Sequence, residues 1–98
     1  MAELHILRAH TVGLAAARKI ALRWVEQAEN EFGMACTYEE GTAMDKVGFE
    51  RYGVAGTLTV TNDCFELHAR LGFLLGAFKE KIEAQISRNL DTLLSAGP

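Results

Sequence analysis

Three side chains capable of acid–base chemistry stand at alternate positions near the middle of the chain: Glu66, His68 and Arg70. Alternate residues of a β-strand share one face, so a carboxylate, an imidazole and a guanidinium would line up there. A catalytic acid or base, however, needs a pKa tuned by burial or by neighbouring charges, and a solvated sheet face provides little of either. We therefore interpret the three residues as members of cross-strand charge pairs.

The other reactive residue types lack the spacing of a metal or covalent site. Cys36 and Cys64 lie far apart and form no CxxC motif of the zinc or thioredoxin kind. His5 and His10 are five residues apart, so on one strand they face opposite sides and cannot chelate one metal by themselves. We accordingly predict a protein that is not an enzyme and that has no cofactor.

An acidic segment lies between positions 39 and 45, where Glu39, Glu40 and Asp45 surround Gly41. Calcium loops of the EF-hand type follow the pattern D-x-D-x-D-G, which this segment does not match. We interpret residues 40–45 as a solvated turn.

The composition indicates a small protein with an apolar core. Of the 98 residues 49% are hydrophobic and 23% are charged, which suffices for one domain over 1–98 without a metal or a disulfide. The net charge of −3 and the scattered basic residues argue against nucleic acid as a partner. The N-terminal residues lack the apolar core of a signal peptide, and no run approaches the roughly 18 apolar residues of a membrane span. We expect a cytoplasmic protein.

The hydrophobic pattern predicts two helices and five strands. The first helix is predicted over residues 12–32, with Thr11 as its N-cap and Gly33 as its left-handed C-terminal residue. The last helix carries an apolar stripe at intervals of three and four residues, from Leu75 and Phe78 to residue 94. Alternation predicts strands over residues 4–9, 34–39, 46–52, 57–61 and 64–71.

These elements predict an α+β fold of the order βαββββα. Consecutive strands joined by short turns, such as Asn62-Asp63, pair as an antiparallel meander. The sheet has one apolar and one polar face, so both helices should pack on the same face in a two-layer sandwich. We expect the first strand to pair beside the last, next to residues 65–71.

The apolar run Leu71–Phe78 allows two conformations with different consequences for function. If the run is helical, Phe73 and Ala77 point away from the buried stripe and, with Leu74, form an exposed apolar patch. Leu22, which lies off the buried face of the first helix, would add to that surface. If instead the strand continues through Phe73 and the helix begins near Leu74, little apolar surface remains exposed. The sequence leaves both conformations open.

Three motifs carry a resemblance that extends over most of the chain. They are the W-x-E-x-A pattern of Trp24–Ala28, the tetrapeptide Tyr38–Gly41, and the run Leu71–Phe78. With these motifs the chain resembles, from about His5 to Leu94, the polyhydroxyalkanoic acid system family. Members are small bacterial proteins encoded beside genes for making and storing polyhydroxyalkanoates. The resemblance implies a setting at storage granules of a hydrophobic polyester, but neither a reaction nor catalytic residues.

Two functions fit these observations. The first is a non-enzymatic accessory protein whose apolar surface, formed by Leu22, Phe73, Leu74 and Ala77, contacts the granule, another granule protein or a second copy in a homodimer. The second is a helix-grip domain that holds a small apolar ligand, such as a hydroxyacyl chain, between the sheet and the last helix. The exposure of Phe73 and the presence of a cavity under the last helix distinguish the two.

Overall fold

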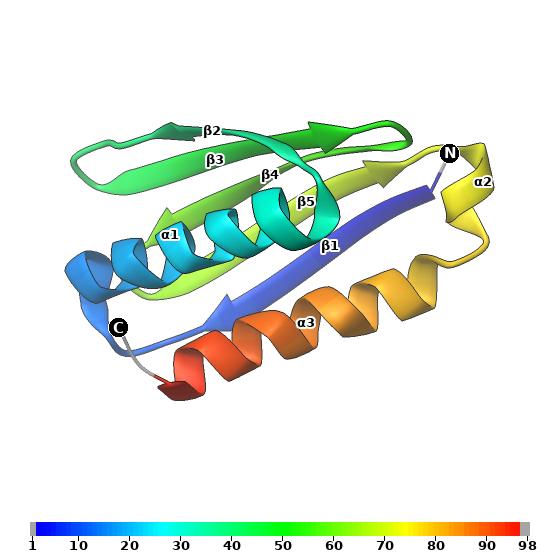
Figure 1. The fold of residues 1–98 in the computed structure, drawn as a ribbon. Coiled ribbons are helices and arrows are strands. Elements are labelled where there is room, and N and C mark those ends of the chain that lie inside the picture. The colour runs from blue at the N-terminus through cyan, green and yellow to red at the C-terminus, as the bar shows by residue number, and fades with distance from the viewer. Residues whose placement is uncertain (1, 97–98) are drawn as a thin grey trace.

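The computed structural model of the protein describes residues 2–96. An antiparallel sheet of five strands forms one layer of the fold. The strand order across the sheet is β1-β5-β4-β3-β2 (Figure 1). The strands are β1 (Ala2–Ala9), β2 (Ala35–Glu39), β3 (Met44–Arg51), β4 (Val54–Thr61) and β5 (Cys64–Leu71). The meander and the position of the first strand beside the last are confirmed.

Two long helices form the second layer, α1 (Gly13–Phe32) and α3 (Lys79–Ala96), and both cover the same face of the sheet (Figure 1). A single helical turn, α2 (Phe73–Gly76), lies between β5 and α3. The α+β fold with both long helices on one face is therefore as predicted. The predicted last helix is divided, however, and its long part begins only at Lys79.

Tight turns set the register of the central strands. Asn62 and Asp63 connect β4 to β5, as predicted, so that Val60 lies opposite Phe65. Tyr52 and Gly53 connect β3 to β4, and Gly53 adopts a left-handed conformation with φ 85° that favours glycine. β4 is longer than predicted, because it begins at Val54 directly after this turn, and β3 begins at Met44, two residues earlier than predicted.

The core lies between the covered face of the sheet and the two long helices. Small residues on α1, including Ala17, Ala21 and Ala28, are buried and allow the helix to approach the strands closely. Trp24 meets Phe49 of β3 edge to face, with ring centroids 5.2 Å apart. The remaining large buried side chains come mainly from alternate strand positions and include Leu4, Ile6, Val47, Leu58, Val60, Phe65, Leu67 and Leu71.

The C-terminal end of α1 is as predicted, whereas its N-cap differs from the prediction. Gly33 ends the helix in a left-handed conformation with φ 63°, as expected. Thr11 is not the N-cap, because the cap position is Val12 and no side chain of the helix start caps it. The backbone N–H of Leu14 instead donates to Oδ1 of Asn62, 3.2 Å away in the β4–β5 turn. A residue 48 positions along the chain thus supplies an acceptor that local sequence cannot reveal.

Candidate functional site

The segment after β5 exposes two adjacent large apolar side chains. β5 ends at Leu71, Gly72 is extended, and α2 then makes one helical turn. Phe73 is 90% exposed and Leu74 is 73% exposed. Phe73 therefore does not continue the inward-facing row of β5, and the conformation that exposes it is the one the protein adopts.

Backbone contacts and one inward side chain hold α2 in place. The N–H of Gly72 donates to the carbonyl oxygen of Gly53, 2.8 Å away in the β3–β4 turn. Leu75 points the other way from its neighbours, packs against the core and lies over Gly53. The orientation of α2 thus depends on Leu75 and the two glycines, while Phe73 and Leu74 make no comparable contribution to the core.

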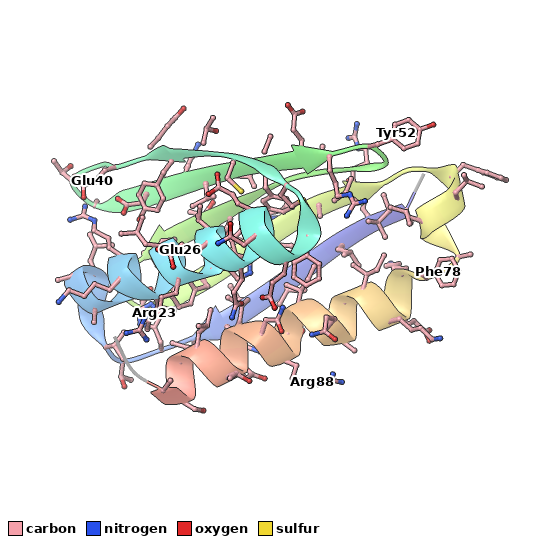
Figure 2. The ribbon with its side chains drawn as sticks, in the orientation of Figure 1. Arg23, Glu26, Glu40, Tyr52, Phe78 and Arg88 are labelled. Carbon is pink, nitrogen blue, oxygen red and sulfur yellow. The ribbon has the colours of Figure 1, made fainter. Side chains whose placement is uncertain are left out.

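Further apolar and aromatic side chains gather at the same end of the molecule. Phe78 is 52% exposed, Ala77 is exposed, and Tyr52 in the neighbouring turn is 94% exposed. Figure 2 shows Tyr52 and Phe78 at the end of the molecule where Figure 1 labels α2. We call Tyr52, Phe73, Leu74, Ala77 and Phe78 the apolar end.

The exposure of Phe78 corrects the prediction that this residue belongs to the buried stripe. In one continuous helix Leu75 and Phe78 would share a face. The chain instead leaves the α-helical path after Gly76, where the N–H of Phe78 donates to the carbonyl oxygen of Leu75, 2.9 Å away and three residues earlier. Glycine favours such a break because its helix propensity is low.

Leu22 is half-exposed, as predicted, but it lies apart from the other three candidate residues. It occupies the middle of α1, which Figure 1 places well away from α2. Phe73, Leu74 and Ala77 are thus brought together in one segment, and Leu22 belongs to a different part of the surface.

A cavity of about 270 Å³ lies between the sheet, α1 and α3. Ligand pockets in proteins usually measure about 300 to 1,000 Å³, so this cavity is slightly smaller than that range. Its walls are mostly apolar, with Leu4, Trp24, Phe49, Leu71, Ile82 and Ile86 among them.

Three amide side chains border this cavity, and the oxygen of one of them has no hydrogen-bond partner within residues 2–96. Oδ1 of Asn89 accepts a hydrogen bond of 3.0 Å from Nε2 of Gln85. Oε1 of Gln27 is buried and has no hydrogen-bond partner within residues 2–96. A buried acceptor without a partner is costly.

The open face of the sheet carries the polar residues singled out in the sequence. Glu66, His68 and Arg70 share this face, as predicted, and alternate with buried residues of β5. His5 of β1 joins them, because it lies directly opposite His68 in the β1–β5 register. A hydrogen bond of 2.7 Å between Nε2 of His5 and Oε2 of Glu66 lowers the pKa of the Glu66 carboxyl. The sequence pattern does not group His5 with Glu66 and His68, although the predicted pairing of β1 with β5 brings their two strands together.

Asp45 corrects the prediction of a solvated acidic turn, because it is fully buried as the second residue of β3. Its carboxylate accepts hydrogen bonds from Nε of Arg18 at 2.9 Å, from the hydroxyl of Tyr38, and from the N–H of Gly41 at 3.0 Å. Burial raises the pKa of Asp45, but these donors outweigh burial and hold the pKa below its ordinary value. All donors of this network come from the protein itself, so we interpret it as structural.

None of the helices within residues 2–96 combines the length and apolar character that crossing a bilayer would require.

Comparison with known proteins identifies a family for this chain. Neither the curated proteins nor the solved structures contain a significant match to the chain. A family model described as "putative polyhydroxyalkanoic acid system protein" matches residues 4–94, which is nearly the whole chain. The chain therefore belongs to this polyhydroxyalkanoic acid system family.

Proposed function

We propose that this protein is a non-enzymatic accessory of the polyhydroxyalkanoate storage system that binds the polyester surface of the granule through its apolar end. The observation that supports the proposal most strongly is the exposure of two adjacent large apolar side chains, Phe73 at 90% and Leu74 at 73%. The proposed location is the surface of storage granules in the cytoplasm.

Apolar contact with a hydrophobic surface would supply the favourable part of the docking free energy. Moving one large apolar side chain out of water stabilises the bound state by about 1.5 to 3 kcal/mol. Scaled by their exposed fractions, Phe73, Leu74 and Phe78 together would contribute roughly 3 to 6 kcal/mol before the cost of immobilising the protein. Phe73 and Leu74 are carried by one helical turn, and the hydrogen bond from Gly72 to Gly53 holds the start of this turn, so little folding is needed on contact.

A polyester surface fits the apolar end better than a second copy of the chain does. A stable protein interface buries about 1,200 to 2,000 Å² in total, and a few side chains on one helical turn contribute only part of that area. An extended hydrophobic surface, in contrast, accepts a small protruding group of apolar side chains without matching its shape. The test must therefore distinguish binding to the granule from homodimerisation through the apolar end.

The test is co-sedimentation of the purified protein with isolated granules. The double substitution Phe73→Asp and Leu74→Asp should reduce the bound fraction by at least about tenfold, because each change removes roughly 2 kcal/mol of transfer energy. Leu22→Asp is the matched control, since it removes an exposed leucine from α1 and should leave binding unchanged.

Circular dichroism and analytical ultracentrifugation complete the experiment. If the folded double variant binds granules as well as the wild type, the proposal is wrong. If the wild type is a dimer that the double variant converts to monomers, and neither form sediments with granules, the apolar end is a dimer interface instead.

A second candidate function is supported by the cavity with its unpaired Gln27 oxygen. A hydroxyacyl chain would place its alkyl part against the apolar walls, and a turn of the Gln27 side chain into the cavity would let Oε1 accept its hydroxyl hydrogen. Binding of 3-hydroxyoctanoate should then exceed binding of octanoate by about three- to tenfold, the range expected for one net hydrogen bond. Calorimetry on the wild type and on Gln27→Leu tests this, because the variant should lose the preference. Absence of binding by both acids would rule out this function.

A further inference from the structure

Two histidines and one glutamate converge on the open face of the sheet, the face opposite α1 and α3 (Figure 1). His5 of β1 and His68 of β5 are directly opposed in the antiparallel register. Glu66 precedes His68 by two positions on β5 and therefore projects from the same face. The three side chains are held by the backbone pairing of two adjacent strands, so their Cβ positions are set by the sheet.

The atoms of these side chains that could bind a metal already lie close together. Oε2 of Glu66 is 2.7 Å from Nε2 of His5 and 3.3 Å from Nε2 of His68. One possible ligand atom from each of the three side chains lies within 4.8 Å of the other two. Ligands that share a tetrahedral zinc ion at about 2.1 Å are themselves roughly 3.4 Å apart. The separations seen here are thus close to those of a metal site.

The orientation of the two imidazoles requires only a local adjustment. The rings are stacked, with centroids 4.2 Å apart and planes inclined by 12°, so both rings present their Nε2 atoms toward Glu66. A metal must lie near the plane of each ring, and a turn of one ring about its Cβ–Cγ bond would achieve this. Both side chains are more than half exposed, so the turn mainly requires breaking the stacking of the two rings on each other.

We propose that His5, Glu66 and His68 form a binding site for a divalent late first-row transition metal, with Zn²⁺ as the representative ion. Two imidazole nitrogens and one carboxylate oxygen suit zinc, nickel and copper, whereas magnesium and calcium prefer oxygen ligands throughout. Three protein ligands leave one tetrahedral position for water or for an atom of a bound partner.

A metal here would also have a structural effect. Within residues 2–96, β1 is an edge strand whose one neighbour is β5, and the proposed site connects the two. Because the ion binds the folded protein and the site does not exist in the unfolded chain, zinc should raise the unfolding temperature. This inference does not depend on the proposed docking to polyester, because the open face and the apolar end are formed by different residues.

The test uses untagged full-length protein titrated with Zn²⁺ in a calorimeter. We expect one ion per chain, and His5→Gln and His68→Gln should each weaken binding by at least about tenfold, since loss even of a group that orients a ligand costs that much. Glu3→Gln is the matched control, because Glu3 lies on the same face of β1, opposite Arg70 rather than His68.

Nuclear magnetic resonance locates the ion on the same samples. The imidazole signals of His5 and His68 should shift with Zn²⁺, while those of His10, which is buried and bonded to the carbonyl oxygen of Thr61, should not. The proposal is overturned if zinc leaves the signals of His5 and His68 unchanged. It is equally overturned if His5→Gln and His68→Gln bind zinc as tightly as Glu3→Gln.

Discussion

At the scale of single residues, the buried carboxylate of Asp45 shows most clearly what local sequence cannot reveal. The segment 39–45 carries several acidic residues and a glycine, which favours a solvated turn. Arg18, 27 positions away on α1, supplies the charge that makes burial of Asp45 tolerable. No local pattern connects the two residues, because their contact depends on how α1 crosses the sheet.

The lowered pKa of Asp45 predicts a specific loss of stability in acid. A carboxyl with a depressed pKa in the folded state stabilises the fold above the unfolded value of about 4, and this contribution disappears as the pH falls through the lower folded-state value. Urea unfolding measured between pH 6 and pH 2 should therefore show a decline below about pH 4. Asp45→Asn should be less stable at pH 6 and should decline less steeply. An equally steep decline in the variant would show that Asp45 does not control this part of the pH profile.

The unpaired oxygen of Gln27 predicts that removing it stabilises the protein. Gln27→Leu replaces a buried acceptor without a partner by an apolar group of similar size, and should raise the free energy of unfolding by about 1 kcal/mol. Gln85→Leu is the control, because the amide of Gln85 already donates to Asn89 and its replacement should give no such gain. Equal effects of the two substitutions in urea titrations would contradict the burial of an unsatisfied group at Gln27.

At the scale of secondary-structure elements, the segment after β5 is where the sequence pattern was least informative. The helical stripe correctly located Leu75, Ile82 and Leu90 on the inward side. It failed at Phe78, because the break after Gly76 changes the helical phase and periodicity alone does not detect such a break. The sequence also left open whether Phe73 continues the inward-facing row of β5, because an apolar residue suits both a strand and a helix.

Two neighbouring leucines provide a test of the orientation of α2. Leu75 packs against the core, so Leu75→Ala should lower the free energy of unfolding by roughly 1 to 2 kcal/mol, less than at a fully buried site. Leu74 is 73% exposed, so Leu74→Ala should change stability by less than about 0.5 kcal/mol. Chemical unfolding of both variants gives the comparison. A larger loss for Leu74→Ala would mean that α2 is turned the other way.

At the scale of the whole molecule, the architecture follows from the sequence more directly than the candidate site does. Alternation of apolar and polar residues, short turns and two amphipathic segments were sufficient for the two-layer α+β fold and for β1 beside β5. The convergence of His5 with Glu66 and His68 follows from that pairing. The cavity under α3 does not, because its volume depends on how individual side chains fill the core.

The proposed attachment to the polyester through Phe73 and Leu74 has a consequence for the whole molecule. The protein carries a net charge of −3, and docking through apolar side chains should not depend on screening of that charge. The most direct measurement is the fraction of protein that sediments with purified granules at low and at high salt. We predict that the wild type and Leu22→Asp sediment equally at both salt concentrations, while the Phe73→Asp, Leu74→Asp variant stays in solution. Sedimentation of that folded variant with the granules, or release of the wild type by salt, would contradict apolar attachment through Phe73 and Leu74.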